Sequence, residues 1–428
     1  MHLLSWAALA RASGLGLALA AVALSPASSQ TLLPTATPAE VGLSAEKLEA
    51  ATRALQAHVD AGDIAGAVAA VVRDGKLVYS QAVGSRDIEV GSPMAFDSLF
   101  RVYSMSRPMA SLGILMLQDE GKLNVNDPVK KYLPKFSAQR VLVDPSAANP
   151  DQTRARKGDI TLANLMTHTS GFGNRESKMY VDRHVRSWDQ TLEQVVDNMA
   201  AVPLFEDPGT AYRYGESADV LGRVIEVVTG MKLEDFYRQR IFEPLGMTDA
   251  VYYVDPARRR RLATAYRPVD GGPLQAFEIE PVPVTEHRAL ISAVGLVASA
   301  TDYLRFSQFF LDGGKVNGRQ LLSPRGIQMA EKNAIPDAVL PIGKTGYNRG
   351  TGWSLGGFAV VMDPTAYDHT VSPGEFWWDG SAGTRFWIDP RENMITIIMA
   401  QVQPSDGKHF REQFKTLVYD AIENHKAP

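Results

Sequence analysis

The chain has 428 residues, of which 45% are hydrophobic and 21% charged, and its formal net charge is -4. This composition is typical of an ordinary globular protein and has no basic excess, so nucleic acid is not an expected partner. Cysteine is absent, which excludes disulfides, thiolate nucleophiles and cysteine metal sites, and the eight histidines show no metal-binding spacing, so no metal is expected.

The first 29 residues have the pattern of a secretory signal peptide. Arg11 precedes a small and apolar run over residues 14–24, and Ala27 and Ser29 stand at the two positions that a signal peptidase reads. A membrane anchor is the alternative, but this run is shorter than the ~20 residues that span a bilayer. The pattern predicts a cleaved signal peptide over residues 1–29, a periplasmic or secreted mature protein and no stable membrane span.

A helix and a hairpin are predicted next. Apolar residues recur at helical spacing over residues 48–59, and Ser44 stands in the N-cap position, which predicts a surface helix. Residues 67–72 and 77–83 are two β-branched runs joined by Arg73-Asp74-Gly75-Lys76. This combination predicts a hairpin with a type I′ turn.

The following apolar segment predicts a helix that is buried on all sides. Residues 109–117 are almost wholly apolar, and Gly121 follows as a stop signal. Ser104 lies at the start of this helix. Residues 135–160 are polar and rich in Pro, Asp and Arg, which predicts a long inserted surface loop.

The middle and the end of the chain differ in pattern. Residues 161–285 alternate helical patterns with Pro and Gly breaks, whereas residues 357–362, 384–388 and 394–401 have strand patterns. Apolar residues at helical spacing over residues 410–422 predict a C-terminal amphipathic helix.

Strands at both ends with helices between them predict an α+β fold, in which an antiparallel sheet flanked by helices is interrupted by a mostly helical domain. We expect the sheet domain to comprise residues 30–110 and 290–428. The helical domain would comprise residues 111–289, including the loop at 135–160. A cleft between them would hold a ligand.

The segment Phe100-Arg101-Val102-Tyr103-Ser104-Met105-Ser106-Arg107-Pro108 is the first candidate site. A serine at the N-terminus of a buried helix meets unpaired backbone donors and the positive end of the helix dipole, and both stabilise a developing oxyanion. Arg107 lies three residues after Ser104 and therefore on the same helix face.

This segment resembles the S-x-x-K motif of the serine β-lactamase and penicillin-binding-protein family, in particular class C β-lactamases and family VIII esterases. Further segments follow in the order found in that family: LMTHTSGF at 165–172, PGT at 208–210, VLG at 220–222, EPLGM at 243–247 and GTRFWIDP at 383–390. The resemblance covers nearly the whole mature chain, and it implies a β-lactamase/transpeptidase-like fold and serine hydrolase activity.

The resemblance also implies roles for individual residues. Ser104 would be the nucleophile and Tyr214 the general base, while Trp378-Asp379-Gly380 stands in place of the K-T-G strand motif. The backbone N–H groups of Ser104 and Ser381 would form the oxyanion hole. Trp378, Asp379, Gly380 and Glu216 would contact the substrate, with Trp378 as a wall of the cleft.

Three residues depart from the family pattern. Arg107 stands where the family has lysine, and because arginine keeps its proton it cannot be the base. Its charge would instead lower the pKa of the Tyr214 phenol and hold it as a phenolate. Glu216 stands where β-lactamases usually have asparagine, and Asp379 would repel anionic substrates such as penicillins. Both argue against an efficient β-lactamase.

Other motif matches are interpreted as incidental. Gly352-Trp353-Ser354-Leu355-Gly356 spells the G-x-S-x-G nucleophile elbow, but a strand pattern follows it where the elbow needs a helix. Lys344-Thr345-Gly346 spells K-T-G within a turn-rich stretch. Ser44 and Ser405 begin literal S-x-x-K segments and are interpreted as helix N-caps. His168 is interpreted as a structural residue in a tight turn.

The sequence thus predicts a serine esterase that hydrolyses small carboxylic esters through an acyl-enzyme on Ser104, with Tyr214 as base and Arg107 stabilising the phenolate. Uncharged or cationic short-chain esters suit Asp379 best. No cofactor is implied, and the expected partner is a small-molecule ester. Two alternatives stay open: a D-amino-acid peptidase or weak β-lactamase, and a catalytically silent binding protein of the same fold in which Arg107 has removed the chemistry.

Overall fold

The computed structural model describes residues 33–146, 151–187, 189–269, 272–277, 292–342, 348–367 and 371–426. The predicted signal peptide lies outside these residues, so its cleavage and the periplasmic or secreted location stay predictions. The described residues from Leu33 onward belong to one compact unit. None of the helices within the described ranges is both long enough and apolar enough to cross a membrane.

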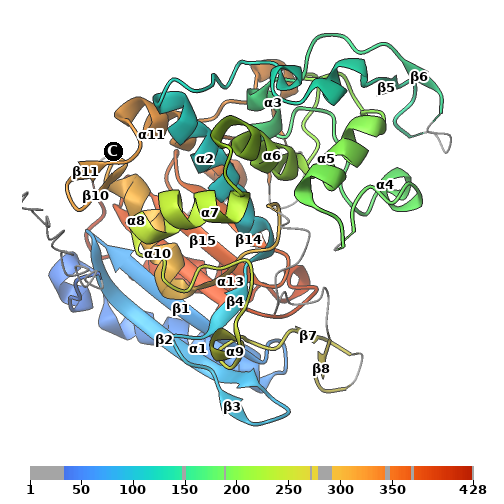
Figure 1. Ribbon diagram of the computed structural model, residues 1–428. Coiled ribbons are helices and arrows are strands. Elements are labelled where there is room, and N and C mark those ends of the chain that lie inside the picture. Colours follow the sequence, from blue (N-terminus) through green and yellow to red (C-terminus); the bar gives the residue numbers. More distant parts are fainter. Residues whose placement is uncertain are drawn as a thin grey trace, which may run out of the picture. The chain divides into compact units, whose positions relative to one another are not determined.

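An antiparallel sheet of eight strands is the centre of this unit (Figure 1). Its order is β12-β13-β14-β15-β16-β1-β2-β3, so strands from the two ends of the chain meet where β16 pairs with β1. The strands are β1 (Gly66–Arg73), β2 (Lys76–Asp87), β3 (Ser92–Pro93), β12 (Thr351–Trp353), β13 (Ala359–Val361), β14 (Phe376–Gly380), β15 (Thr384–Asp389) and β16 (Met394–Ala400). This arrangement confirms the predicted α+β architecture.

The predicted hairpin is the β1–β2 pair. Asp74 and Gly75, the two central residues of its turn, have φ angles of 54° and 71°. A type I′ turn requires positive φ at both positions, which Asp and Gly tolerate. The local sequence therefore determined this turn.

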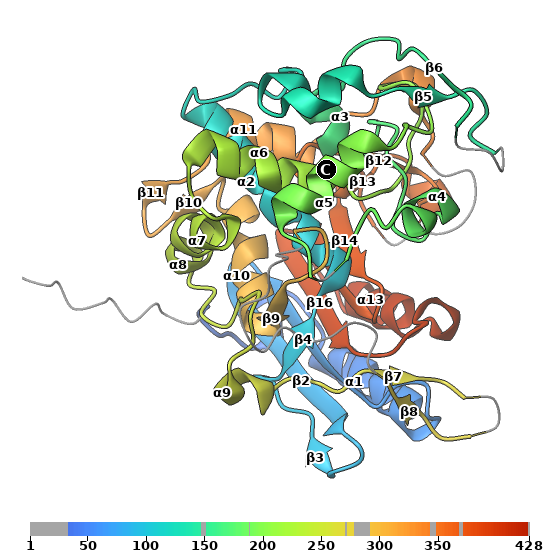
Figure 2. The same cartoon turned by 45° about the vertical axis from the view of Figure 1, so that its right-hand side comes forward.

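Helices cover both faces of the sheet. α1 (Ala45–Asp60) and α13 (Phe410–Asp420) pack against one another on one face, and α10 (Ala300–Leu311) packs on β1 and β16 from the other (Figure 2). The Ser44 side chain accepts a hydrogen bond from the backbone N–H of Lys47, which confirms the predicted N-cap of α1.

The remaining helices lie mainly in the middle of the chain. They are α2 (Arg107–Asp119), α3 (Leu162–Met166), α4 (Lys178–Asp182), α5 (Leu192–Ala201), α6 (Ser217–Thr229), α7 (Leu233–Tyr237) with the π-helical turn η5 (Arg238–Phe242), α8 (Glu243–Leu245), α9 (Pro256–Arg259), α11 (Pro324–Glu331) and α12 (Pro364–Tyr367). α2 is buried at every position from Arg107 to Leu117, as predicted, and packs against α6.

Short strand pairs complete the fold. They are β4 (Leu99–Arg101) with β9 (Val297–Ser299), β5 (Val141–Leu142) with β6 (Thr153–Arg154), β7 (Tyr266–Arg267) with β8 (Gln275–Ala276), and β10 (Lys315–Val316) with β11 (Arg319–Gln320). The β5–β6 pair lies within residues 135–160, so the inserted segment expected to be a loop contains two short antiparallel strands. The predicted domain boundaries at residues 110 and 290 stay a prediction.

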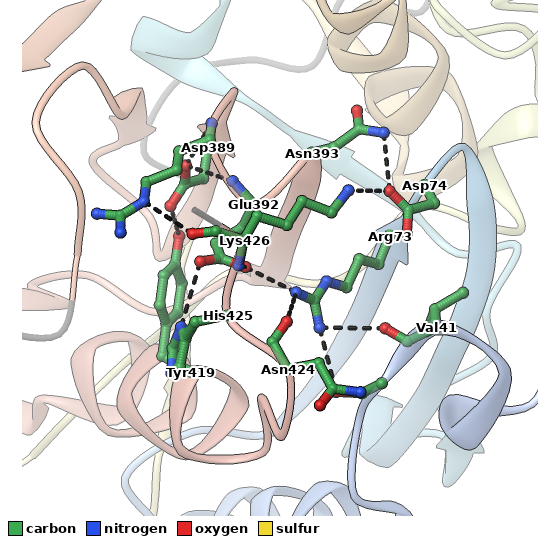
Figure 3. Close-up of polar contacts among 12 residues, drawn as sticks. Val41, Arg73, Asp74, Asp389, Glu392, Asn393, Tyr419, Asn424, His425 and Lys426 are labelled. Atoms are coloured by element: carbon green, nitrogen blue, oxygen red, sulfur yellow. Dashed lines mark hydrogen bonds and ion pairs between the residues drawn. The ribbon is translucent and has the colours of Figure 1, made fainter. Parts of the chain in front are cut away.

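A buried arginine ties the start and the end of the described chain to the sheet (Figure 3). Arg73, at the end of β1, donates to the carbonyl oxygens of Val41 at 3.1 Å and Asn424 at 2.8 Å. It also donates to the Glu392 carboxylate at 2.7 Å. Both charged side chains are at most 3% exposed. The pair therefore holds the β15–β16 turn and the C-terminal segment against β1.

Candidate active site

Ser104 lies in a single turn of 3-10 helix, η2 (Tyr103–Ser106), which leads directly into α2. Tyr103 has a φ of 44°, a left-handed conformation that costs energy for a bulky residue. Ser104 is partly exposed, whereas Tyr103 and Met105 on either side of it are buried. The strained turn thus presents the Ser104 side chain at the start of a buried helix, as the sequence predicts.

Three hydrogen bonds from distant segments fix this turn. The backbone N–H of Val102 donates to the carbonyl oxygen of Leu296 at 3.0 Å, and the N–H of Leu296 donates to Ser106 Oγ at 3.1 Å. The Tyr303 hydroxyl, from α10, donates to the carbonyl oxygen of Met105. Sequence reasoning missed these supports, because nothing in the local pattern links them to Ser104.

The structure brings the predicted site residues together around the phenol of Tyr214. Trp378 Nε1 donates a hydrogen bond to the phenol oxygen at 3.1 Å, and Ser104 hydrogen-bonds the same oxygen. The Arg107 guanidinium lies 4.5 Å from the centre of the Tyr214 ring, and Arg107 Nη1 donates to the carbonyl oxygen of Gly215 at 2.6 Å. Ser104, the Tyr214 phenol, the Arg107 guanidinium and the Trp378 indole therefore form one cluster.

The expected direction of the Tyr214 pKa is wrong. Burial raises the pKa of the phenol, and this effect exceeds the opposing effects of Arg107, Ser104 and Trp378, so the pKa lies above its ordinary value. The charge of Arg107 lowers the pKa of Tyr214, as predicted. Removal of the phenol from water raises this pKa by more than one buried cation lowers it. The neutral phenol is therefore the main form of Tyr214 at pH 7.

His168 is closer to this chemistry than its interpretation as a turn residue suggested. Its φ of 55° agrees with a tight turn. Its ring centre lies 4.5 Å from that of Tyr214, and the N–H of Gly215 donates to His168 Nδ1 at 3.5 Å. Burial and the nearby Arg107 hold the pKa of His168 well below its ordinary value. His168 is thus a neutral ring packed against the phenol.

A second layer of buried charges lies behind Arg107. Glu216, which is 3% exposed, has its Oε2 3.6 Å from Arg107 Nη2 and 3.6 Å from Arg186 Nη1. Burial raises the pKa of Glu216, but Arg107 and Arg186 more than offset this, so its pKa is below the ordinary value. The expectation that Glu216 contacts the substrate is not supported, because its carboxylate is enclosed by arginines.

Strand β14 presents alternate residues to opposite sides of the sheet. Trp378 faces Tyr214, so Gly380 lies on the same side and Asp379 on the other. A Cβ on Gly380 would lie 2.5 Å from the carbonyl oxygen of Val102, so only glycine lets the strand approach the turn that holds Ser104. Ser381 follows directly and is exposed. Its oxyanion-hole role, together with that of the Ser104 N–H, stays a prediction.

The expected repulsion of anionic substrates by Asp379 stays a prediction. Its carboxylate pairs with Arg411 Nη1 of α13 at 3.2 Å, on the sheet face opposite Trp378. Burial raises the pKa of Asp379, although Arg411 and Arg385 act against it. Arg411 thus offsets part of the Asp379 charge, which still acts on the candidate site because it contributes to raising the pKa of the Tyr214 phenol.

The incidental motifs can now be placed. Ser354 is buried in the turn between β12 and β13 and accepts a hydrogen bond from the N–H of Phe358 at 3.3 Å, so its surroundings are strand, turn and strand, not a nucleophile elbow. Lys344-Thr345-Gly346 lies outside the described residues. Ser405 makes no capping hydrogen bond, contrary to expectation, and its hydroxyl donates to the carbonyl oxygen of Ser381 at 3.4 Å.

Comparison with known proteins shows which proteins this chain resembles. The family model described as Beta-lactamase matches residues 51–419. Protein Rv1367c of Mycobacterium tuberculosis is 33% identical over 356 residues, covering 81% of this chain and 88% of that protein. Esterase EstB of Burkholderia gladioli is 28% identical over 361 residues, covering 78% and 86%. The solved structure of EstCE1, a hydrolase with promiscuous acyltransferase activity, superposes with a TM-score of 0.76 at 23% identity, covering 87% of this chain and 99% of that one.

Proposed function

Because this chain belongs to the beta-lactamase family, we propose that it is a serine ester hydrolase whose nucleophile is Ser104. The convergence of Ser104 and Trp378 Nε1 on the phenol oxygen of Tyr214 carries this proposal. Such an arrangement couples a nucleophile to a proton acceptor within hydrogen-bonding reach. Esterase EstB, one of the relatives of this chain, supports the same reaction class.

The proposed reaction has two steps. Ser104 transfers its proton to the Tyr214 phenolate while its oxygen attacks the ester carbonyl carbon, and the tetrahedral oxyanion accepts hydrogen bonds from the N–H groups of Ser104 and Ser381. Tyr214 then protonates the departing alcohol oxygen, which leaves an acyl-enzyme. Water then attacks the acyl-enzyme while Tyr214 accepts its proton. Tyr214 passes this proton to Ser104 Oγ as the acyl C–O bond breaks, which releases the carboxylic acid and restores both the free serine and the phenolate.

Arg107 is a fixed cation in this mechanism. An arginine does not release its proton in a protein, so it cannot replace Tyr214 as base. Its charge lies against the ring that becomes anionic, and it therefore stabilises the phenolate relative to the neutral phenol. The substitution of arginine for lysine is thus compatible with catalysis.

Small carboxylic esters are the proposed substrates. Uncharged or cationic esters fit the Asp379 carboxylate best, because its charge acts on Tyr214 even though Asp379 pairs with Arg411. Trp378 contributes an indole where the family has the lysine of K-T-G, so this position lacks a cation for a substrate carboxylate. Penicillins and peptides ending in a free carboxylate would lose that contact, which makes the peptidase or β-lactamase reaction the weaker candidate.

Hydrolysis of p-nitrophenyl butyrate by the wild type, Ser104→Ala and Ser354→Ala tests the proposal. We expect activity to disappear in Ser104→Ala and to persist in Ser354→Ala, and a fluorophosphonate to label every form except Ser104→Ala. If Ser354→Ala lost activity while a folded Ser104→Ala kept it, the assignment of Ser104 as the nucleophile would be overturned. A folded wild type that neither hydrolyses the ester nor reacts with the fluorophosphonate would identify a silent binding protein.

A further inference from the structure

Glu216 has an unusual place in the fold. It occupies the N-cap position of α6, yet its side chain makes no capping hydrogen bond. Its carboxylate is turned toward the two arginines, with Oε2 3.6 Å from a terminal nitrogen of each. Glutamate is not among the preferred N-cap residues, so helix capping does not account for a glutamate here.

We propose that Glu216 is a positioning residue that, with Arg186, holds the Arg107 guanidinium against the Tyr214 ring. This inference rests on the proposed function, because it assigns Glu216 to the same reaction without any contact with the substrate. It also implies that the arginine at 107 and the glutamate at 216, two separate departures from the family pattern, compensate one another.

The geometry at Arg107 supports this role. One terminal nitrogen, Nη1, is held by the carbonyl oxygen of Gly215 at 2.6 Å, while the other, Nη2, faces Glu216. Arg107 is 4% exposed, so its charge is removed from water and needs an opposite charge nearby. A planar guanidinium held at both terminal nitrogens has a fixed plane, and here that group lies over the Tyr214 ring.

A neutral side chain at position 216 could not hold the Arg107 guanidinium in this way. Arg107 and Arg186 approach the same carboxylate oxygen, so removal of its charge would leave two buried cations facing one another. The N–H of Arg175 also donates to Glu216 Oε1 at 3.3 Å, which fixes the other carboxylate oxygen. The carboxylate therefore has positively polarised partners on both oxygens.

Other titratable groups face this network from neighbouring elements. Asp219, one turn further along α6, accepts a hydrogen bond from the N–H of Ala293 at 3.0 Å, and burial raises its pKa to about 6. His168 packs as a neutral ring against Tyr214, since burial lowers its pKa, and Asp379 faces α13. Measurements above pH 7 therefore keep Asp219 ionised and His168 neutral while Tyr214 titrates.

The test is a double-mutant cycle read as pH–rate profiles above pH 7. In Glu216→Gln we expect the rising limb to move to higher pH by about one unit, which lowers kcat about tenfold at a fixed pH, with KM changed less than about twofold. Because Glu216 acts through Arg107, adding Glu216→Gln to Arg107→Gln should change neither the limb nor kcat further. The exposed Glu423→Gln is the matched charge control and should behave as the wild type.

The inference would be overturned if the losses in kcat were additive in the double variant. It would also be overturned if the rising limb of the pH–rate profile of Glu216→Gln stayed in place or moved to lower pH. If Glu216→Gln does not fold, Glu216→Asp, which keeps the charge but shortens the side chain, should show an intermediate displacement; an unchanged limb there also contradicts the role. Fluorophosphonate labelling of Ser104 separates the two proposals. If the wild type is labelled and active but Glu216→Gln has the same pH–rate profile, only the role of Glu216 is rejected. If the wild type is neither labelled nor active, the proposed function itself is rejected.

Discussion

The indole Nε1 of Trp378 donates a hydrogen bond to the phenol oxygen of Tyr214 across 3.1 Å. Trp378 comes from β14, near the end of the chain, and Tyr214 lies two residues before the N-cap of α6. This bond connects the sheet to the helical region at the atom that would accept the Ser104 proton. It also places a donor where negative charge develops when the phenol ionises.

Replacing Trp378 by phenylalanine removes this donor while keeping an aromatic ring. Hydrogen bonds to charged groups contribute about 1.5–3 kcal/mol, so kcat should fall roughly ten- to a hundredfold and the rising limb should move to higher pH. Ester hydrolysis measured across pH 7 to 10 checks this. Trp387→Phe, a buried tryptophan on the α13 side of β15, is the control and should leave the limb in place. Equal profiles for both variants would contradict a role for the indole N–H.

The rate of ester hydrolysis should rise continuously with pH. In the proposed mechanism the reactive form is the Tyr214 phenolate, and the pKa of this phenol is raised above its ordinary value mainly by burial. Below that pKa the phenolate fraction increases about tenfold per pH unit, so log kcat should rise with a slope of about one through pH 9. A pH-stat assay with an alkyl butyrate measures this without p-nitrophenyl ester background. A plateau that begins near pH 7 would show a different base.

Loss of the cation at 107 should weaken catalysis without abolishing acylation of Ser104. In Arg107→Met the Tyr214 pKa should rise further, and because a nearby opposite charge typically moves a pKa by roughly 1 to 3, kcat at pH 8 should fall about ten- to a thousandfold. Arg53→Met, at an exposed position of α1, is the control. Unchanged kcat in a folded Arg107→Met protein would remove Arg107 from the mechanism.

Gly380 should not tolerate a side chain. In Gly380→Ala the new Cβ would lie 2.5 Å from the carbonyl oxygen of Val102, so β14 must move away from the turn that carries Ser104. We expect an overpacking cost of about 1–3 kcal/mol in urea unfolding and a large loss of kcat. Gly407→Ala, where the new Cβ meets no atom within 4 Å, is the matched control. Full activity in Gly380→Ala would show that this close approach is not required.

The Arg73–Glu392 pair should contribute to stability and not to catalysis (Figure 3). Arg73→Met leaves a buried carboxylate without its cation, which typically costs about 3–5 kcal/mol. Urea unfolding should show this loss, while the pH–rate profile of the remaining folded protein stays as in the wild type. The double variant Arg73→Met, Glu392→Leu should recover part of the stability. An Arg73→Met protein as stable as the wild type would contradict this role of the Arg73–Glu392 pair.

Much of the fold followed from local sequence. The β1–β2 turn depends on Asp74 and Gly75, and the N-cap at Ser44 depends on one hydroxyl and the helix it begins, so neighbouring residues were sufficient. The position of Ser104 was recognisable for a similar reason, because this polar residue stands just before a long apolar helix. Such features need no information from distant parts of the chain.

The candidate site was only partly predictable. The order of short motifs along the chain singled out Ser104, Arg107, Tyr214 and Trp378, and the structure places these four side chains in one cluster. The supports of the Ser104 turn, by contrast, come from Tyr303 and other residues far along the chain, and no local pattern connects them.

The sequence by itself determined which residues are candidates for the chemistry, because periodicity, turn residues and motif order can be read without knowledge of the packing. Only the tertiary structure decided what surrounds them. It turned Asp379 toward Arg411, enclosed Glu216 between two arginines and buried the Tyr214 phenol enough to raise its pKa. These outcomes depend on desolvation and on charges from segments distant in sequence, and both are set when the helices pack against the sheet.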